Sequence, residues 1–312
     1  QLKAPGYIDQ YQTLNGVIPG HGTYKKDAKN RYDYGFSSGY ISYTPSKYFN
    51  FQFGHDKNFI GDGYRSLLLS DNAFNYPFLK ITTSFWKIKY VNLYAEMMDI
   101  RAPHTYERGY RKKYATMHYL SYNVSKRFNI SLFESIIWQA DDSSGQRGFD
   151  FNYLNPIIFF RPVEFSLGSP DNVSLGMNLK FKITDNYQLY GQILLDEFLL
   201  KNIKAGNGWW GNKYGFQAGL KAFDLAGISN LNFQTEYNYV RPFTYSHYEP
   251  LSNYAHYNQP LAHPLGSNFY ESVSFVNYRW KSFVAEGKLL YAIHGIDPAD
   301  KNYGNDLYKS YH

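Results

Sequence analysis

The stretch from Val173 to Ile183, VSLGMNLKFKI, alternates strictly between apolar and polar positions. Because successive side chains of a β-strand point to opposite faces, this strand has one apolar face and one polar face. Its length also suits a tilted strand that crosses a lipid bilayer. The stretch predicts a membrane-crossing strand, so we expect Leu179→Arg to be damaging and Asn178→Arg to be tolerated.

The same alternation recurs in Phe49–Gly54 and in Leu231–Asn238. A soluble β-sandwich also alternates, because each of its sheets has a core face and a solvent face. The kinds of residue decide between the two folds, because charged positions lie opposite bulky aromatics in strands of about ten residues, a length that crosses a tilted bilayer path. The aromatic content supports this choice: 33 Tyr, 24 Phe and 5 Trp make up 20% of the chain. Aromatic girdles at the membrane interfaces are typical of outer-membrane barrels.

Alternating segments and turn residues together predict twelve strands in six hairpins. The expected strands are 34–43, 48–55, 78–86, 90–98, 116–124, 128–136, 173–183, 187–196, 214–222, 231–239, 272–278 and 283–293. Short turns alternate with long connections at 56–77, 99–113, 139–172, 199–213 and 241–271. The prediction is an all-β, antiparallel, transmembrane outer-membrane β-barrel with at least twelve strands, short periplasmic turns and long extracellular loops.

Two regions are expected along the chain. Residues 1–33 lack a sustained period and are interpreted as an entry segment or a plug-like loop. Residues 34–312 are expected to form the barrel, incomplete at the C-terminus. Because a sheet edge in lipid cannot stay unpaired, we expect either that more strands exist in the full protein or that another segment seals this edge.

Composition excludes several classes of protein. No run approaches the roughly 18 apolar residues of a membrane-spanning helix. The absence of cysteine excludes disulfides and thiolate metal sites. The net charge of +6 comes from scattered Lys and Arg rather than from one stripe, which argues against nucleic acid and suits anionic lipopolysaccharide.

Catalytic and metal-binding patterns are weak. His118, Glu134, Glu236, Glu286 and His294 lie on or near expected strands, but no spacing singles out a catalytic set. His247, His256 and His263 lack a known ligand spacing, and Asp141, Asp142 and Asp150 lack the carboxylate pattern of a calcium loop. We predict no enzymatic activity, no metal and no cofactor.

The long connections mix aromatic rings with amide side chains. Sugars stack their C–H faces on such rings and offer hydroxyls to amides, so this mixture suits a glycan. Interfacial girdles and loop packing are the alternative use of the same residues. The candidate glycan-binding residues are Trp209, Trp210, Tyr245, Tyr248, Tyr254, Tyr257 and Asn258.

Several motifs, taken in order, resemble the Wzi-type capsule-assembly family of outer-membrane barrels, especially its Bacteroidetes branch, which includes the gliding-motility protein RemB. The resemblance covers most of Phe49 to Gly295. The motifs are NFIGDGYRSLLLSDN at 58–72, Phe149–Phe151 with Asn155–Pro156, Arg161–Glu164, Arg241–Pro242 and NQPLAHPLG at 258–266.

This resemblance implies a non-enzymatic barrel in the outer membrane of a Gram-negative bacterium, with typically eighteen strands and a lectin-like surface for exported polysaccharide. Its partners would be outer-membrane lipid, lipopolysaccharide and surface polysaccharide. An alternative is a barrel subunit of a gliding-motility or type IX secretion complex, whose loops bind other outer-membrane proteins. A diffusion porin is a further alternative, which loops folded into the lumen would exclude.

Overall fold

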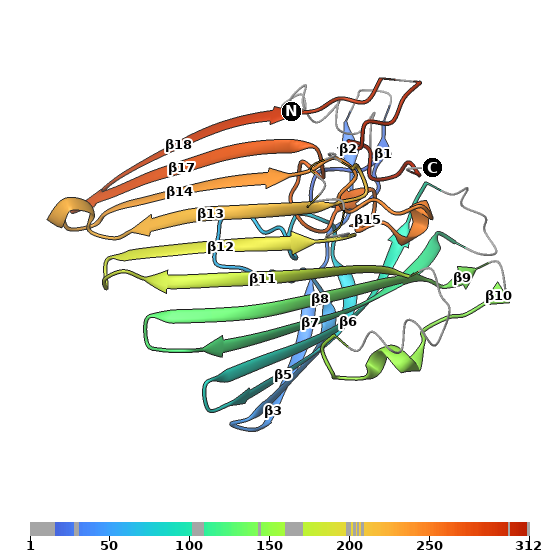
Figure 1. Ribbon diagram of the computed structural model, residues 1–312, viewed down its shortest axis with the longest axis horizontal. Coiled ribbons are helices and arrows are strands. Elements are labelled where there is room, and N and C mark those ends of the chain that lie inside the picture. Colours follow the sequence, from blue (N-terminus) through green and yellow to red (C-terminus); the bar gives the residue numbers. More distant parts are fainter. Residues whose placement is uncertain are drawn as a thin grey trace.

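The chain forms one large, curved antiparallel sheet of twelve strands (Figure 1). The computed structural model describes residues 16–27, 31–101, 109–142, 145–159, 171–197, 201, 204, 206, 209–298 and 300–310. The strands follow one another in sequence order from β3 to β18, and these two strands form the edges. Every neighbouring pair is antiparallel, as hairpin connections require.

The twelve strands agree closely with those expected from the sequence. They are β3 (Gly39–Ser46), β4 (Phe49–Asp56), β5 (Tyr76–Phe85), β6 (Ile88–Asp99), β7 (Arg111–Asn123), β8 (Phe128–Gln139), β11 (Asn172–Lys182), β12 (Tyr187–Leu195), β13 (Tyr214–Ala222), β14 (Leu231–Val240), β17 (Phe269–Trp280) and β18 (Phe283–His294). Pro45, expected in a turn, instead lies in β3 at an irregularity between Tyr43 and Ser46. An edge strand tolerates proline there because the ladder is already interrupted.

Short turns gather at one end of the sheet and long connections at the other, on the left and right of Figure 1. We call these the turn end and the loop end. The small strand pairs are β1 (Lys25–Lys26) with β2 (Tyr32–Asp33), β9 (Asp141–Asp142) with β10 (Gly145–Gln146), and β15 (Ala255–His256) with β16 (Gln259–Pro260). Three short 3-10 helices lie in the described parts of the connections: η1 (Phe151–Leu154), η2 (Leu225–Gly227) and η3 (Pro250–Ser252). None of the helices in the described part of the chain is long and apolar enough to cross a membrane.

Burial on the sheet is the reverse of that in a soluble sandwich. The polar side chains Asn178, Gln217 and Glu236 face inward and are at most 3% exposed. The apolar Ile193 and Phe216 face outward and are 42% and 40% exposed. Burying polar groups while exposing apolar rows is favourable only where lipid covers the outside. The predicted faces are therefore confirmed, and the sandwich is excluded.

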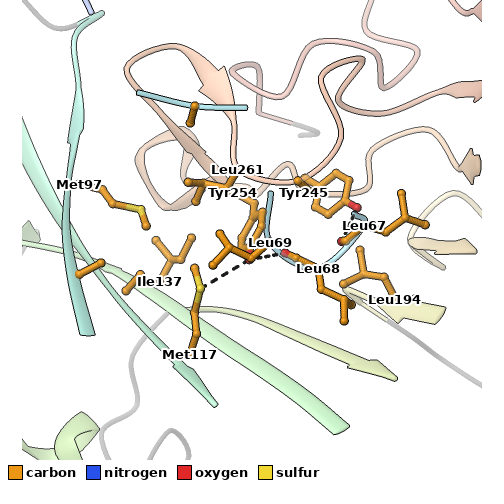
Figure 2. Packing of buried hydrophobic residues seen from close by; sticks show 14 of the residues in the cluster. Leu67, Leu68, Leu69, Met97, Met117, Ile137, Leu194, Tyr245, Tyr254 and Leu261 are labelled. Carbon is orange, nitrogen blue, oxygen red and sulfur yellow. Dashed lines mark hydrogen bonds between the residues drawn. The ribbon is translucent and has the colours of Figure 1, made fainter. Parts of the chain in front are cut away.

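The interior is occupied by residues 57–75, the inner segment, which connects β4 to β5. Leu67, Leu68 and Leu69 of this segment are fully buried. They pack with inward-facing apolar residues of the strands, among them Met117, Ile137 and Leu194 (Figure 2). The sheet's hydrophobic core thus lies around this segment, near the loop end.

Residues 1–15 and 28–30 of the expected entry segment lie outside the described residues. The described part beside them contacts the inner segment, because Lys57 donates a hydrogen bond from Nζ to the carbonyl of Gly20 at 2.9 Å. Gly20 in turn donates its backbone N–H to Gln259 Oε1 at 2.6 Å. This stretch therefore lies where the inner segment meets the loop-end connections.

Candidate functional site

The inner segment is held by polar side chains that point inward from the strands. Asp62 accepts a hydrogen bond from Asn178 and forms an ion pair with Lys180, both at 2.8 Å. The carboxylate of Glu236 accepts the backbone N–H groups of Tyr64 at 2.8 Å and Arg65 at 3.1 Å. Buried polar groups need such partners, and the inner segment supplies them.

Arg65 makes the strongest of these attachments. Its guanidinium donates to both carboxylate oxygens of Glu271 on β17, at 3.1 and 3.0 Å. A two-pronged pair of this kind fixes geometry as well as adding energy. Gly63 beside it has no room for a side chain, since a Cβ there would lie 2.3 Å from a Glu236 oxygen. The inner segment therefore fits one position against β12 to β17.

A second segment, residues 241–268, covers the inner segment at the loop end; we call it the cap segment. Tyr245 and Tyr254 stack with ring centroids 5.6 Å apart. Their hydroxyls donate to the carbonyls of Leu67 at 2.8 Å and Leu68 at 2.6 Å. Figure 2 shows both rings resting on the leucine run. The cap segment and the inner segment thus form one packed unit.

These contacts change the interpretation of two candidate glycan-binding residues. Tyr245 and Tyr254 are 1% and 2% exposed. Because both rings are enclosed and both hydroxyls bind the leucine carbonyls, neither offers a surface to a ligand outside. Their role in this structure is to join the cap segment to the inner segment.

The remaining candidates lie in separate places at the loop end. Trp210 is 38% exposed, and its ring lies 5.9 Å from Trp209 and 5.3 Å from Phe243. Tyr248 contacts His247, with centroids 4.5 Å apart.

Tyr257, half-buried like its neighbour Asn258, packs against Phe74 at 5.1 Å and Tyr110 at 6.1 Å. The structure thus does not gather the predicted set into one site. Trp210 is the most exposed residue of the set, and we call Trp209, Trp210 and the neighbouring Phe243 the rim cluster.

Histidines of the cap segment make structural hydrogen bonds. His256 accepts the backbone N–H of Met98 at Nδ1, and its Nε2 donates to the carbonyl of Asn75. His263 bonds to Glu271 at 2.8 Å. Burial lowers the pKa of His256 to about 3 and that of His263 to about 4. Among the described residues, no three potential metal-ligating side chains come together.

His118 on β7 and Glu134 on β8 form a buried pair on the outer face of the sheet. The two side chains are 3.0 Å apart and at most 4% exposed. Residues 150–159 cover them from outside, and the backbone N–H of Phe159 donates to Glu134. A cleft for a substrate is missing from this described region, because the space around the pair is only about 10 Å³. The pair attaches the covering segment to the wall.

Sequence reasoning missed the inner segment, which it interpreted as an external connection. The signal available was the run of three leucines at 67–69 in an otherwise polar stretch. Three neighbouring leucines left exposed on a connection would form an apolar patch in water, so such a run is expected to be buried. A connection that folds into the barrel can bury it. The loop's length also indicated a function of its own.

Comparison with known proteins agrees with this geometry. No protein-family model and no curated protein matches the chain. Among solved structures, Wzi, an outer membrane protein of Escherichia coli involved in group 1 capsule assembly and described as a carbohydrate-binding β-barrel, aligns with a TM-score of 0.59 at 13% identity. The alignment covers 91% of this chain and 62% of Wzi, so the chain spans less than two thirds of its length.

OpdQ of Pseudomonas aeruginosa aligns with a TM-score of 0.42 at 12% identity, over 90% of this chain and 70% of OpdQ. OpdK of the same organism gives 0.41 at 8% identity, over 88% of this chain and 68% of OpdK. The outward apolar faces, the filled interior and the alignment with Wzi lead to one conclusion. The chain has a Wzi-like outer-membrane β-barrel fold.

Proposed function

We propose that this chain is a non-enzymatic barrel of the Gram-negative outer membrane whose loop end binds or organises surface polysaccharide. The observation that carries the proposal is the rim cluster, an aromatic surface with Trp210 exposed, on a barrel whose interior is occupied at the loop end. Flat aromatic faces with polar neighbours suit the C–H faces and hydroxyls of sugars. The carbohydrate-binding description of Wzi supports the same role.

The surroundings of the rim cluster suit a sugar in a second way. Arg241 lies beside it and donates from Nη1 to the carbonyl of Asn212 at 2.9 Å, so it brings positive charge to the aromatic surface. Phe243, whose backbone φ of 66° is unusual for a residue other than glycine, presents its ring to Trp210. Strained residues persist where the surrounding structure holds them, and they are frequent at binding sites.

A diffusion porin agrees less well with the structure. The inner segment forms ion pairs with Lys180 of β11 and Glu271 of β17. A solute crossing the barrel would have to displace these contacts and the buried leucines. The alternative of a motility or secretion subunit would use the same loop end to bind protein, and the experiment below separates it from the glycan role.

The test combines Trp209→Ala with Trp210→Ala and measures retention of surface polysaccharide on cells, together with binding of the purified barrel to that polysaccharide. We expect a several-fold loss in both assays with unchanged heat-modifiable gel mobility. The matched control is Trp280→Ala, which removes a tryptophan 58% exposed at the turn end. Unchanged glycan binding, with loss of an outer-membrane protein partner instead, would refute the glycan role and favour the protein-binding alternative.

A further inference from the structure

A cavity of about 510 Å³ lies inside the barrel on the turn-end side of the inner segment. Residues 57–62 form its roof, and strands β5 to β8 and β11 form its walls. Lys89 and Asn123 lie at the strand ends next to the turns and are exposed, so the mouth of the cavity opens there. This volume falls within the range of small-molecule sites.

Four lysines line this cavity against a single aspartate. They are Lys57, Lys80, Lys89 and Lys180. The aspartate, Asp62, is already paired with Lys180 at 2.8 Å and bonded to Asn178. Its carboxylate is therefore not available to neutralise the other three ammonium groups.

None of those three lysines has a carboxylate within hydrogen-bonding distance among the described residues, and Asp56 and Asp71 attract Lys57 and Lys80 only from farther away. Lys57 donates to the carbonyl of Gly20 and Lys80 to Asn58 Oδ1, each at 2.9 Å. The ammonium group of Lys89 makes no hydrogen bond or ion pair with the described residues. Placing like charges around a partly enclosed space is unfavourable unless an anion or water occupies it.

The rest of the lining has the chemistry of a sugar site. Thr82, Ser121, Asn123 and Asn129 line the cavity, and the Asn129 amide joins Ser121 and Asn123 by hydrogen bonds of 2.9 Å. Phe59, which is 39% exposed, contributes a ring. Hydroxyls and amides can bond both to sugar hydroxyls and to water, and a ring stacks on C–H faces. A bare inorganic anion would use the lysines but neither the ring nor most of these polar groups.

We propose that this cavity binds a saccharide that carries a carboxylate or a phosphate, entering from the turn end. Lys80 and Lys89 hold the anionic group, while the side chains of β7 and β8 hold hydroxyls. This site is distinct from the rim cluster at the loop end, and neither site depends on the other.

The test measures binding to the whole purified chain in detergent by calorimetry, at low ionic strength because the charges of the mouth are screened by salt. The probes are digalacturonate, the neutral disaccharide galactobiose, galactose 6-phosphate and inorganic phosphate. We expect the two anionic sugars to bind, and galactobiose and inorganic phosphate to bind at least tenfold more weakly. The two anionic sugars together distinguish a carboxylate from a phosphate as the preferred group.

Lys89→Gln should weaken binding of the preferred anionic sugar by about tenfold, as expected for one charge-assisted hydrogen bond. This variant breaks no side-chain hydrogen bond or ion pair to the described residues, so loss of the fold would not explain its effect. Lys80→Gln should act similarly, with melting of the barrel measured alongside because Lys80 also holds Asn58. The matched control is Lys281→Gln, an exposed lysine in the β17–β18 turn, which should leave binding unchanged.

Location is checked separately by labelling. The natural chain has no cysteine, so Lys89→Cys gives a single reactive thiol, and an anionic sugar should slow its reaction with a maleimide. Equal binding of galactobiose would overturn the proposal, as would binding of inorganic phosphate as tightly as of the sugars. Binding by Lys89→Gln equal to that of the wild type would also overturn it. The Trp209→Ala and Trp210→Ala variant should bind these probes normally, which separates this proposal from the one for the loop end.

Discussion

Replacing Leu179 with arginine tests the claim that the outward rows face lipid. Strand β11 has 11 residues, so at a rise of about 3.3 Å and a tilt of about 40° it crosses about 28 Å, the thickness of the hydrocarbon. Leu179 lies two residues from the strand's middle, hence about 5 Å from the midplane. Arginine costs about 2–4 kcal/mol at the midplane and about 0–1 near the interface, so we expect about 2 kcal/mol here.

That cost corresponds to a roughly 30-fold smaller ratio of folded to unfolded barrel. The assay is urea unfolding in phospholipid vesicles, followed by heat-modifiable gel mobility. The control is Asn277→Arg on β17, which lies as far from its strand's turn end as Leu179 does, but is exposed on the inward face. It should change stability by less than about 0.5 kcal/mol. Equal damage from both substitutions, or greater damage from Asn277→Arg, would refute the assignment of faces.

Two further predictions concern the filled interior. Glu236→Ala leaves two backbone N–H groups of the inner segment without their acceptor, each at a cost of about 1–3 kcal/mol. Protease cleavage within 57–75 and single-channel conductance in planar bilayers should both rise. An unchanged conductance would show that the inner segment does not depend on Glu236. Burial lowers the pKa of His256 from 6.5 to about 3 and that of His247 from 6.5 to about 4. At a pH between the lowered pKa and 6.5, each histidine therefore binds a proton in the unfolded cap segment but not in the folded one. The cap segment should thus be most stable above pH 6.5 and lose stability as the pH drops toward 4. Hydrogen exchange in 241–268, corrected for the intrinsic rate, should be faster at pH 5 than at pH 7.5. Equal corrected rates would contradict this prediction.

The strands were predictable because their signals are local. Alternation within Val173–Ile183 sets the faces of β11, and the turn residues at 184–186 set its pairing with β12, without knowledge of the rest of the chain. The predicted Tyr214–Ala222 strand agrees with β13 at both ends. Such signals depend on residues a few positions apart, which a sequence shows directly.

The interior was not predictable in the same way, because its contacts join distant parts of the chain. Asp62 meets Asn178 across 116 positions, and Arg65 meets Glu271 across 206. Asn178 illustrates the consequence. The alternation alone predicts that Asn178 is solvated and can be substituted, whereas the structure buries it completely against the inner segment. Asn178→Arg should therefore be damaging, contrary to the expectation from the pattern.

The candidate glycan-binding residues also depend on distant contacts, which the sequence does not show. Tyrosine has an apolar ring and a polar tip, so a sequence cannot distinguish a tyrosine that stacks on a sugar from one that packs on leucines and bonds to their carbonyls. Tyr245 and Tyr254 are of the second kind. The tryptophans at 209 and 210 keep the exposure that the glycan hypothesis needs for at least one of them, Trp210.

The long reach of the inner segment's contacts has a consequence for how the molecule is built. Residues 57–75 leave the early strand β4, yet their ionic and backbone anchors belong to β11, β12, β14 and β17. Pairings so distant in sequence form late, since closing long stretches of chain costs entropy before any contact repays it. We therefore expect the inner segment to become anchored only after the later hairpins have formed, so that the sheet and the inner segment reach their final arrangement together.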